Sequence, residues 1–152
     1  MSVTSFWFGK AILNAFGGET AGESTSIDYL SNDIKVALFT SDAVLAQDTN
    51  EFFGDLSNEC AATGNYSAGG ATLASKTLGY TAGTNVIKFG AANVTWSSST
   101  ISARYAVVYR DTGNTATSPL MGYINFGATF SSSNGDFTIT WDAGGILTIT
   151  AA

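Results

Sequence analysis

Four carboxylates within a short stretch are the residues of this sequence best suited to chemistry. They are Asp48, Glu51, Asp55 and Glu59. A pair of carboxylates flanking a glycosidic bond can hydrolyse it, but this spacing gives no sign that two of these groups face each other across a cleft. The chain has no histidine, which excludes a Ser-His-Asp triad and a histidine metal ligand. We therefore expect a protein that is not an enzyme and that carries no cofactor.

The same stretch is also the best candidate for a metal site. Asp48-Thr49-Asn50-Glu51 begins like a calcium-binding loop, but the pattern fails at Phe52, where an oxygen ligand should stand. Cys60 is the one cysteine, so it has no partner for an intramolecular disulfide. We expect no metal site, and we expect the acidic residues to cap and solvate a loop.

Aromatic residues offer a second kind of site, since the chain has ten Phe, six Tyr and three Trp. An exposed aromatic strip on a β-sheet can stack sugar rings. Five of these residues stand at strand spacing and are more simply assigned to the core: Trp96, Tyr105, Tyr109, Phe137 and Trp141. Others lie outside the main strand region and are better candidates for contact with another protein: Phe6, Trp7, Phe8, Phe52 and Phe53.

The charge distribution is uneven. The net charge is −6, and most of the acidic residues lie between Glu19 and Glu59, with Lys35 as the one base among them. This stretch is either a solvated acidic face or a surface that meets a basic partner. Six scattered bases argue against a nucleic-acid partner. The sequence shows no apolar run long enough to span a membrane and no basic start of a signal peptide, so we expect folding in a cytoplasm.

The hydrophobic pattern predicts an all-β fold. Alternating apolar residues and turn signals, such as Asn134-Gly135, indicate eight strands at a spacing of about ten residues. These strands are expected near 34–40, 71–80, 85–90, 93–97, 101–110, 119–127, 136–141 and 145–151. Such a series is typical of an antiparallel β-sandwich or jelly roll. We expect one domain over residues 1–152, with a long loop over 41–70 that contains a helical turn near Glu51-Phe52-Phe53.

The N-terminal segment predicts a short helix over residues 5–16, ended by Gly17-Gly18. This helix is apolar nearly all round, so the segment 1–18 must be buried either in its own domain or against a neighbouring protein. In the second case it is a contact arm, whose apolar area comes from Phe6, Trp7, Phe8, Ile12, Leu13 and Phe16. Phe52 and Phe53, in the acidic loop, form the second candidate contact.

Six motifs, in a specific order, carry a resemblance to a known family. They are Asp33–Ser41, Gln47–Phe53, Gly64–Leu73, Ala103–Tyr109, Pro119–Gly127 and Ser133–Asp142. Over about three quarters of its length, the chain resembles a family of virion structural proteins of tailed bacteriophages. Members of that family are labelled as virion, head or minor tail proteins, and no catalytic residues are established for them.

The resemblance implies a capsid decoration, or cement, protein. Such a protein binds the outer surface of the head and stabilises the contacts between major capsid proteins. It is present in the host cytoplasm during assembly and on the capsid surface of the virion afterwards. A homo-oligomer is expected, with a trimer favoured because it would suit the threefold sites of the shell. The alternatives are a tail component (tube, tip or fibre) and, in a different class, a carbohydrate-binding receptor module.

Overall fold

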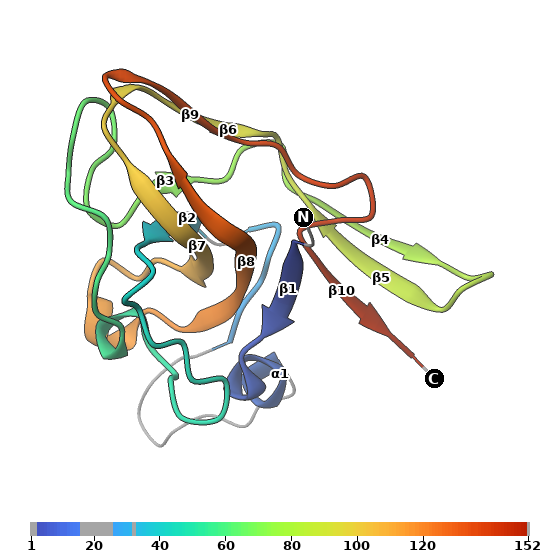
Figure 1. Ribbon diagram of the computed structural model, residues 1–152. Helices are drawn as coiled ribbons and strands as arrows, with labels where there is room; N and C mark the ends of the chain where they lie inside the picture. Colours follow the sequence, from blue (N-terminus) through green and yellow to red (C-terminus); the bar gives the residue numbers. More distant parts are fainter. Residues whose placement is uncertain (1–2, 16–25, 32, 152) are drawn as a thin grey trace.

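The computed structural model describes residues 3–15, 26–31 and 33–151 (Figure 1). Its described residues form ten strands, one short α-helix and two 3-10 turns. In chain order these are β1 Thr4–Trp7, α1 Gly9–Ala15, β2 Ile34–Phe39, η1 Phe53–Asp55, β3 Ala71–Thr72, β4 Thr77–Thr81, β5 Val86–Gly90, β6 Val94–Ser99, β7 Ser102–Arg110, η2 Thr115–Thr117, β8 Leu120–Ser131, β9 Gly135–Ile139 and β10 Leu147–Thr150. All the strand pairs are antiparallel. The expected all-β, sandwich-like fold is confirmed.

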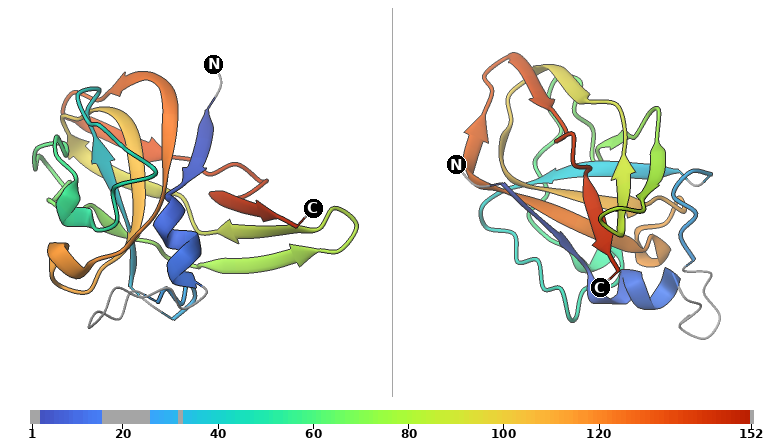
Figure 2. Two further views of the ribbon diagram at one scale, coloured as in Figure 1. Left: turned by 90° about the horizontal axis from the view of Figure 1, so that it is seen from below. Right: turned by 90° about the vertical axis from the view of Figure 1, so that its right-hand side faces the viewer.

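The strands form three sheets. The largest has the order β1-β8-β7-β2-β3, the second has the order β10-β5-β4, and β6 pairs with β9 in the third. The β4–β5 hairpin extends away from the body of the molecule beside β10 (Figures 1 and 2). The η1 turn confirms the helical turn expected near Glu51-Phe52-Phe53.

The centre of the five-stranded sheet, formed by β2 and β7, is buried on both faces, and β2 shows how. Val36 and Leu38 point into a cluster that also holds Trp96 and Phe137 from β6 and β9. Ala37 and Phe39 alternate with them and point into a second cluster on the opposite face. Because the strand is covered on both sides, its sequence is almost continuously apolar instead of alternating. Full burial of each large apolar side chain here contributes about 1.5–3 kcal/mol.

The second cluster is covered by the N-terminal segment and the long loop rather than by a sheet. Phe8 and Ala11 from the N-terminal segment, Ala43 from the loop and Phe53 from η1 pack on the sheet there. The hydrophobic layer that covers this face is therefore supplied by segments whose sequence carries little strand periodicity.

The helix expected over residues 5–16 is wrong in its first part. Residues Thr4–Trp7 form β1, which pairs with β8 in a register that sets Phe6 opposite Tyr123. The helix begins only at Gly9 and is described to Ala15, and the expected stop at Gly17-Gly18 lies outside the described residues. The physical reason is that aromatic and β-branched residues fit a pleated surface, and the open edge of β8 supplies the backbone partners that a helix would otherwise provide.

Two other expectations about strands need correction. The single strand expected over 71–80 is two short strands. The N–H of Leu73 still donates to the carbonyl of Ile34 in the β2–β3 register, and the chain then turns at Ser75, which has a positive φ of 50°, before β4 pairs with β5. The strand expected over 119–127 continues to Ser131 as β8. Among the described residues, no helix is long and apolar enough to cross a membrane.

Candidate functional site

The predicted contact arm is largely packed within its own domain. Phe8 has no exposed surface, and its N–H donates to the carbonyl of Met121 on β8. The ring of Phe6 stacks on Tyr123 with centroids 5.0 Å apart. Trp7 packs edge-on against Phe89 at 5.0 Å and donates its indole N–H to the carbonyl of Thr148, 2.8 Å away. These aromatic rings therefore join β1 to β8, β5 and β10.

The remaining residues of the predicted sites differ in exposure. Ile12 is half-buried, whereas Leu13 is 57% exposed; Phe16 lies outside the described residues. Phe53 is buried and stacks on Tyr109, with centroids 4.1 Å apart. Phe52 is half-buried. Of the aromatic residues assigned to a contact, Phe8 and Phe53 belong to the core, and Leu13 is the most exposed side chain of the α1 candidates.

The structure brings the two candidate segments together. Lys10 of α1 forms an ion pair with Glu51 at 2.6 Å, and the N–H of Gly9 donates to the carbonyl of Gln47 at 3.0 Å. The side-chain amide of Gln47 in turn donates to the carbonyl of Trp7 at 2.6 Å. The segment 41–56 therefore lies against α1. We call these two segments, α1 and 41–56, the contact face.

The contact face combines exposed apolar and acidic side chains. Leu13 is 57% and Val44 is 77% exposed, and the exposed acidic residues of the face are Asp42, Asp48 and Asp55. The backbone beneath them is firmly held, because Ala11 and Ala43 are both buried in the second cluster. A surface fixed in this way can bind another protein without first having to be ordered.

The four carboxylates considered for catalysis do not form one site. Glu51 pairs with Lys10, and one oxygen of Asp55 accepts hydrogen bonds from the N–H groups of Glu51 and Phe52 at 2.9 Å each. Glu59 accepts from Tyr66 and Gly69, as described below, and Asp48 is exposed. Within the described residues, no three His, Cys, Asp or Glu side chains are grouped so that they could hold a metal ion.

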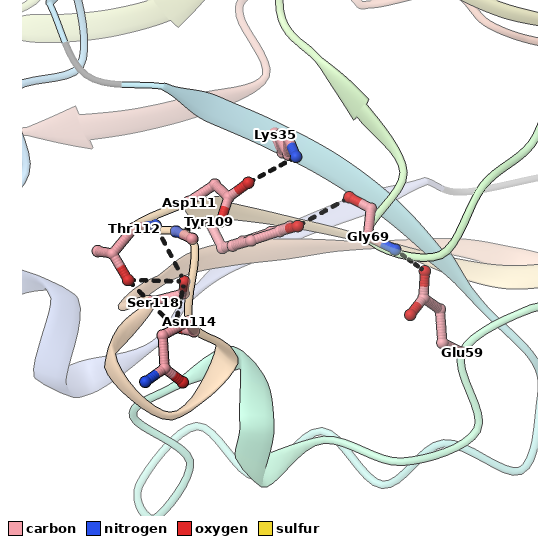
Figure 3. A network of polar contacts seen from close by, with 9 residues as sticks. Lys35, Glu59, Gly69, Tyr109, Asp111, Thr112, Asn114 and Ser118 are labelled. Atoms are coloured by element: carbon pink, nitrogen blue, oxygen red, sulfur yellow. Dashed lines mark hydrogen bonds and ion pairs between the residues drawn. The ribbon is translucent and has the colours of Figure 1, made fainter.

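Glu59 belongs to a polar network under the long loop (Figure 3). Its carboxylate accepts hydrogen bonds from the Tyr66 hydroxyl at 2.8 Å and from the N–H of Gly69 at 2.7 Å. The carbonyl of Gly69 accepts from the Tyr109 hydroxyl at 2.8 Å. Burial raises the pKa of Glu59 against the effect of these two donors, and burial also raises the pKa values of Tyr66 and Tyr109. The network fastens the 59–69 loop to β2 and β7.

The far end of the network stabilises the turn after β7 (Figure 3). Lys35 forms an ion pair with Asp111 at 2.5 Å, and this contact lowers the pKa of Asp111. The buried hydroxyl of Ser118 accepts from the N–H of Thr112 at 3.1 Å and donates to the carbonyl of Asn114 at 2.8 Å. The polar groups named here are all hydrogen-bonded or ion-paired within the fold, and these contacts hold the loop and the turn in place.

A shallow groove of about 630 Å³ lies between β1, β8, β9 and the 141–146 turn. Its lining includes Phe126, Phe130, Phe137 and Trp141, with Asp136 and Asp142 beside them. Phe130 is 44% exposed. The indole N–H of Trp141 already donates to the carbonyl of Ala92 at 2.9 Å. The groove can therefore offer aromatic faces and two carboxylates to a ligand.

From the sequence, Phe137 and Trp141 are expected in the core, whereas Phe126 and Phe130 are not predicted to belong to any site. The core assignment is confirmed for Trp96, Tyr109 and Phe137, while Tyr105 and Trp141 are half-buried. The pairing of β7 with β8 is irregular beside these residues, since Ala103 pairs with Phe130 but Tyr105 pairs with Asn125. Extra residues in one strand form a bulge that redirects side chains, and Gly127, at φ 80°, is where this one lies.

Comparison with known proteins gave no significant match, whether to family models, to curated proteins or to solved structures.

Proposed function

We propose that this protein is a capsid decoration protein of a tailed bacteriophage. It binds the outer surface of the head through its contact face and links neighbouring major capsid proteins. The observation that carries the proposal is the ion pair between Lys10 and Glu51, which joins two segments far apart in the sequence into one surface with exposed apolar and acidic side chains. The motif resemblance supplies the class of partner.

The work of such a protein is stabilisation by mass action. A ligand that binds the assembled shell but not its dissociated subunits stabilises the assembly by RT ln(1 + [L]/Kd), about 2.7 kcal/mol at a hundredfold excess over Kd. No reaction is required, which agrees with polar groups that are committed to structural contacts. A homo-oligomer is part of the proposal, and the trimer expected from shell symmetry remains a prediction.

The test is binding to empty, expanded shells of the phage that encodes the chain. Removing the N-terminal segment would also remove Phe8 from the core, so point substitutions are needed. The double variant Leu13→Asp/Val44→Asp changes exposed side chains of the contact face. We expect at least a tenfold loss of binding. The matched control is Phe130→Asp, another exposed apolar residue, which lies in the groove. Equal binding by the double variant and the wild type would contradict the proposal.

Copy number separates a head protein from a tail component. Quantitative mass spectrometry of purified virions gives the ratio of this chain to the major capsid protein. We expect a ratio near one or a simple fraction of one. A few copies up to a few dozen per particle would favour the tail tube, tail tip or fibre instead.

The groove favours one second candidate, a carbohydrate-binding module. Its aromatic rings, Phe130 and Trp141, could stack on sugar rings while Asp136 and Asp142 accept hydrogen bonds from hydroxyl groups. Binding on a glycan array that is lost in Phe130→Asp would support this candidate. Because the same variant is the control for shell binding, one protein distinguishes the two functions.

A further inference from the structure

The β4 strand is an exposed edge at the outside of the molecule. All five of its residues are exposed, with Leu78 at 46% and Tyr80 at 61%. In the described part of the chain β4 pairs with β5 alone. Figure 2 shows the β4–β5 hairpin reaching beyond the rest of the fold. An edge of this kind can add a further strand by backbone hydrogen bonding.

The register shows which backbone groups of β4 face outward. The N–H of Ala151 donates to the carbonyl of Asn85, in line with the pairing of Ile149 with Ile87. The odd-numbered residues of β5 therefore bond to β10, and the even-numbered residues, including Lys88, bond to β4. Lys88 pairs with Gly79. It follows that Leu78 and Tyr80 direct their N–H and carbonyl groups away from β5, toward the open edge.

The other edge of this sheet is partly occupied, which distinguishes it from β4. On β10 the same alternation turns the carbonyl of Thr148 outward, and the indole N–H of Trp7 donates to it at 2.8 Å. Natural edge strands are commonly protected by charged residues, proline or bulges. The sequence of β4, Thr77-Leu78-Gly79-Tyr80-Thr81, contains no charge and no proline, and its pairing with β5 is regular.

We propose that β4 is a self-association edge, at which a second copy of this chain pairs antiparallel about a two-fold axis at Gly79. In that register Leu78 of each copy lies opposite Tyr80 of the other, and the two glycines face each other across the axis. Because Leu78 and Tyr80 both point their backbone groups outward, two hydrogen-bonded pairs flank the axis and provide four backbone hydrogen bonds. The strand is thus complementary to itself.

The side chains fit the same register. In β4 and β5, Tyr80 pairs with Ile87 and Leu78 pairs with Phe89, so these four side chains share one face. The two-fold pairing would extend this apolar face across both copies, with each leucine beside a tyrosine. Cross-strand pairs of an aromatic with an aliphatic residue stabilise antiparallel sheets. Gly79 has no atom within 4 Å of the position that a Cβ would occupy, so the axis itself is free of steric hindrance.

Charge favours a second copy as the occupant. The chain carries −6, so two copies repel each other over most of their surface. Residues 77–87 carry no charge, and Lys88, which pairs with Gly79, is the one charged residue of β4 and β5. The acidic 41–56 segment lies on the other side of the molecule (Figure 1). Contact at β4 therefore brings two acidic proteins together with little repulsion. The shared area is small, so the association should be weak, with a Kd between about 1 µM and 1 mM.

The test is a charge exchange at the axis, followed by sedimentation equilibrium of the full chain up to about 1 mM. Gly79→Lys and Gly79→Asp each place two like charges opposite each other across the axis, where Cβ atoms lie about 5 Å apart. We expect the wild type to approach twice the mass of the chain, each variant alone to weaken association at least tenfold, and an equimolar mixture of the two variants to recover it. Gly83→Lys is the matched control, since Gly83 also has open space around it but lies in the turn.

A wild type that forms a trimer over this range would overturn the two-fold pairing proposed here. A wild type that stays monomeric would also overturn it, and would leave the edge to a strand of another protein. A dimer unaffected by Gly79→Lys, or weakened equally by Gly83→Lys, would overturn the proposed register. The measurement uses the free protein without shells. Failure of self-association is therefore distinguishable from failure of shell binding, and this inference does not depend on the proposed function.

Discussion

The hydroxyl of Tyr66 connects the long loop to the centre of the main sheet. It accepts a hydrogen bond from the N–H of Leu38 on β2 at 2.9 Å and donates to Glu59 at 2.8 Å. We predict that Tyr66→Phe lowers the free energy of unfolding by about 1–3 kcal/mol, because buried polar groups then lose their partner. Urea denaturation measures the change. In the control Tyr80→Phe, an exposed hydroxyl loses its bond to Asn85, and the expected loss is below about 0.5 kcal/mol. Equal losses would contradict this role.

Glu59 makes the stability of the loop depend on pH. Burial raises its pKa above the ordinary value of 4.5, so the folded protein takes up this proton more readily than the unfolded chain. The resulting stability is present below the ordinary pKa and is lost as pH rises through the raised pKa of the folded state. We predict that Glu59→Gln, which keeps an oxygen acceptor but cannot ionise, becomes more stable relative to wild type between pH 4 and pH 7. Urea denaturation at both pH values tests this, and a difference that does not change with pH would refute it.

At the scale of elements, the close approach of the 63–70 loop to β2 depends on one glycine. Gly70 has φ 74°, and a Cβ there would lie 1.9 Å from the carbonyl oxygen of Val36. Since β2 is fixed between two strands, its backbone cannot move aside. We predict that Gly70→Ala lowers the free energy of unfolding by more than about 3 kcal/mol, or prevents folding, as measured by chemical denaturation.

Gly113→Ala is the control that separates a clash from backbone strain. Gly113 has φ 83°, and a Cβ there would have no atom within 4 Å. Its substitution should cost about 1–2 kcal/mol, the penalty of a left-handed conformation alone. If both variants lose the same stability, the contact with Val36 is not what constrains Gly70.

The elements also show why the sequence could predict one part of this structure and not another. The strands β2, β5, β6, β7 and β9 lie close to their expected positions, because a period of two residues and turn signals such as Asn134-Gly135 are local properties. The strand β1 was expected to be helical, because its pairing depends on the edge of β8, which lies more than a hundred residues away. The joining of α1 to the 41–56 segment has the same cause. These features depend on contacts between residues far apart in the sequence, so the spacing of residue types along the chain does not predict them.

At the scale of the whole molecule, the two hydrophobic clusters share the same strands. Val36 and Leu38 enter one cluster, while Ala37 and Phe39 enter the other. Neither cluster can lose its packing without exposing the opposite face of β2 to water. We therefore expect the body of the protein to unfold as one cooperative unit, with the β4–β5 hairpin as the part that opens most readily, because β4 is exposed along its whole length.

Chemical labelling of Cys60 can measure whether the core unfolds as one cooperative unit. Cys60 lies in the cluster that contains Trp96, with 6% exposure, and burial raises its pKa to about 11. Since the thiolate is the reactive form, iodoacetamide should modify Cys60 at pH 8 only when the core opens. We predict that the free energy of opening obtained from the labelling rate, and its dependence on urea, match those of global unfolding followed by tryptophan fluorescence. The labelling rate of the unfolded chain at high urea supplies the reference. A shallower dependence on urea would mean that the loop carrying Cys60 opens separately, and would contradict a single cooperative core.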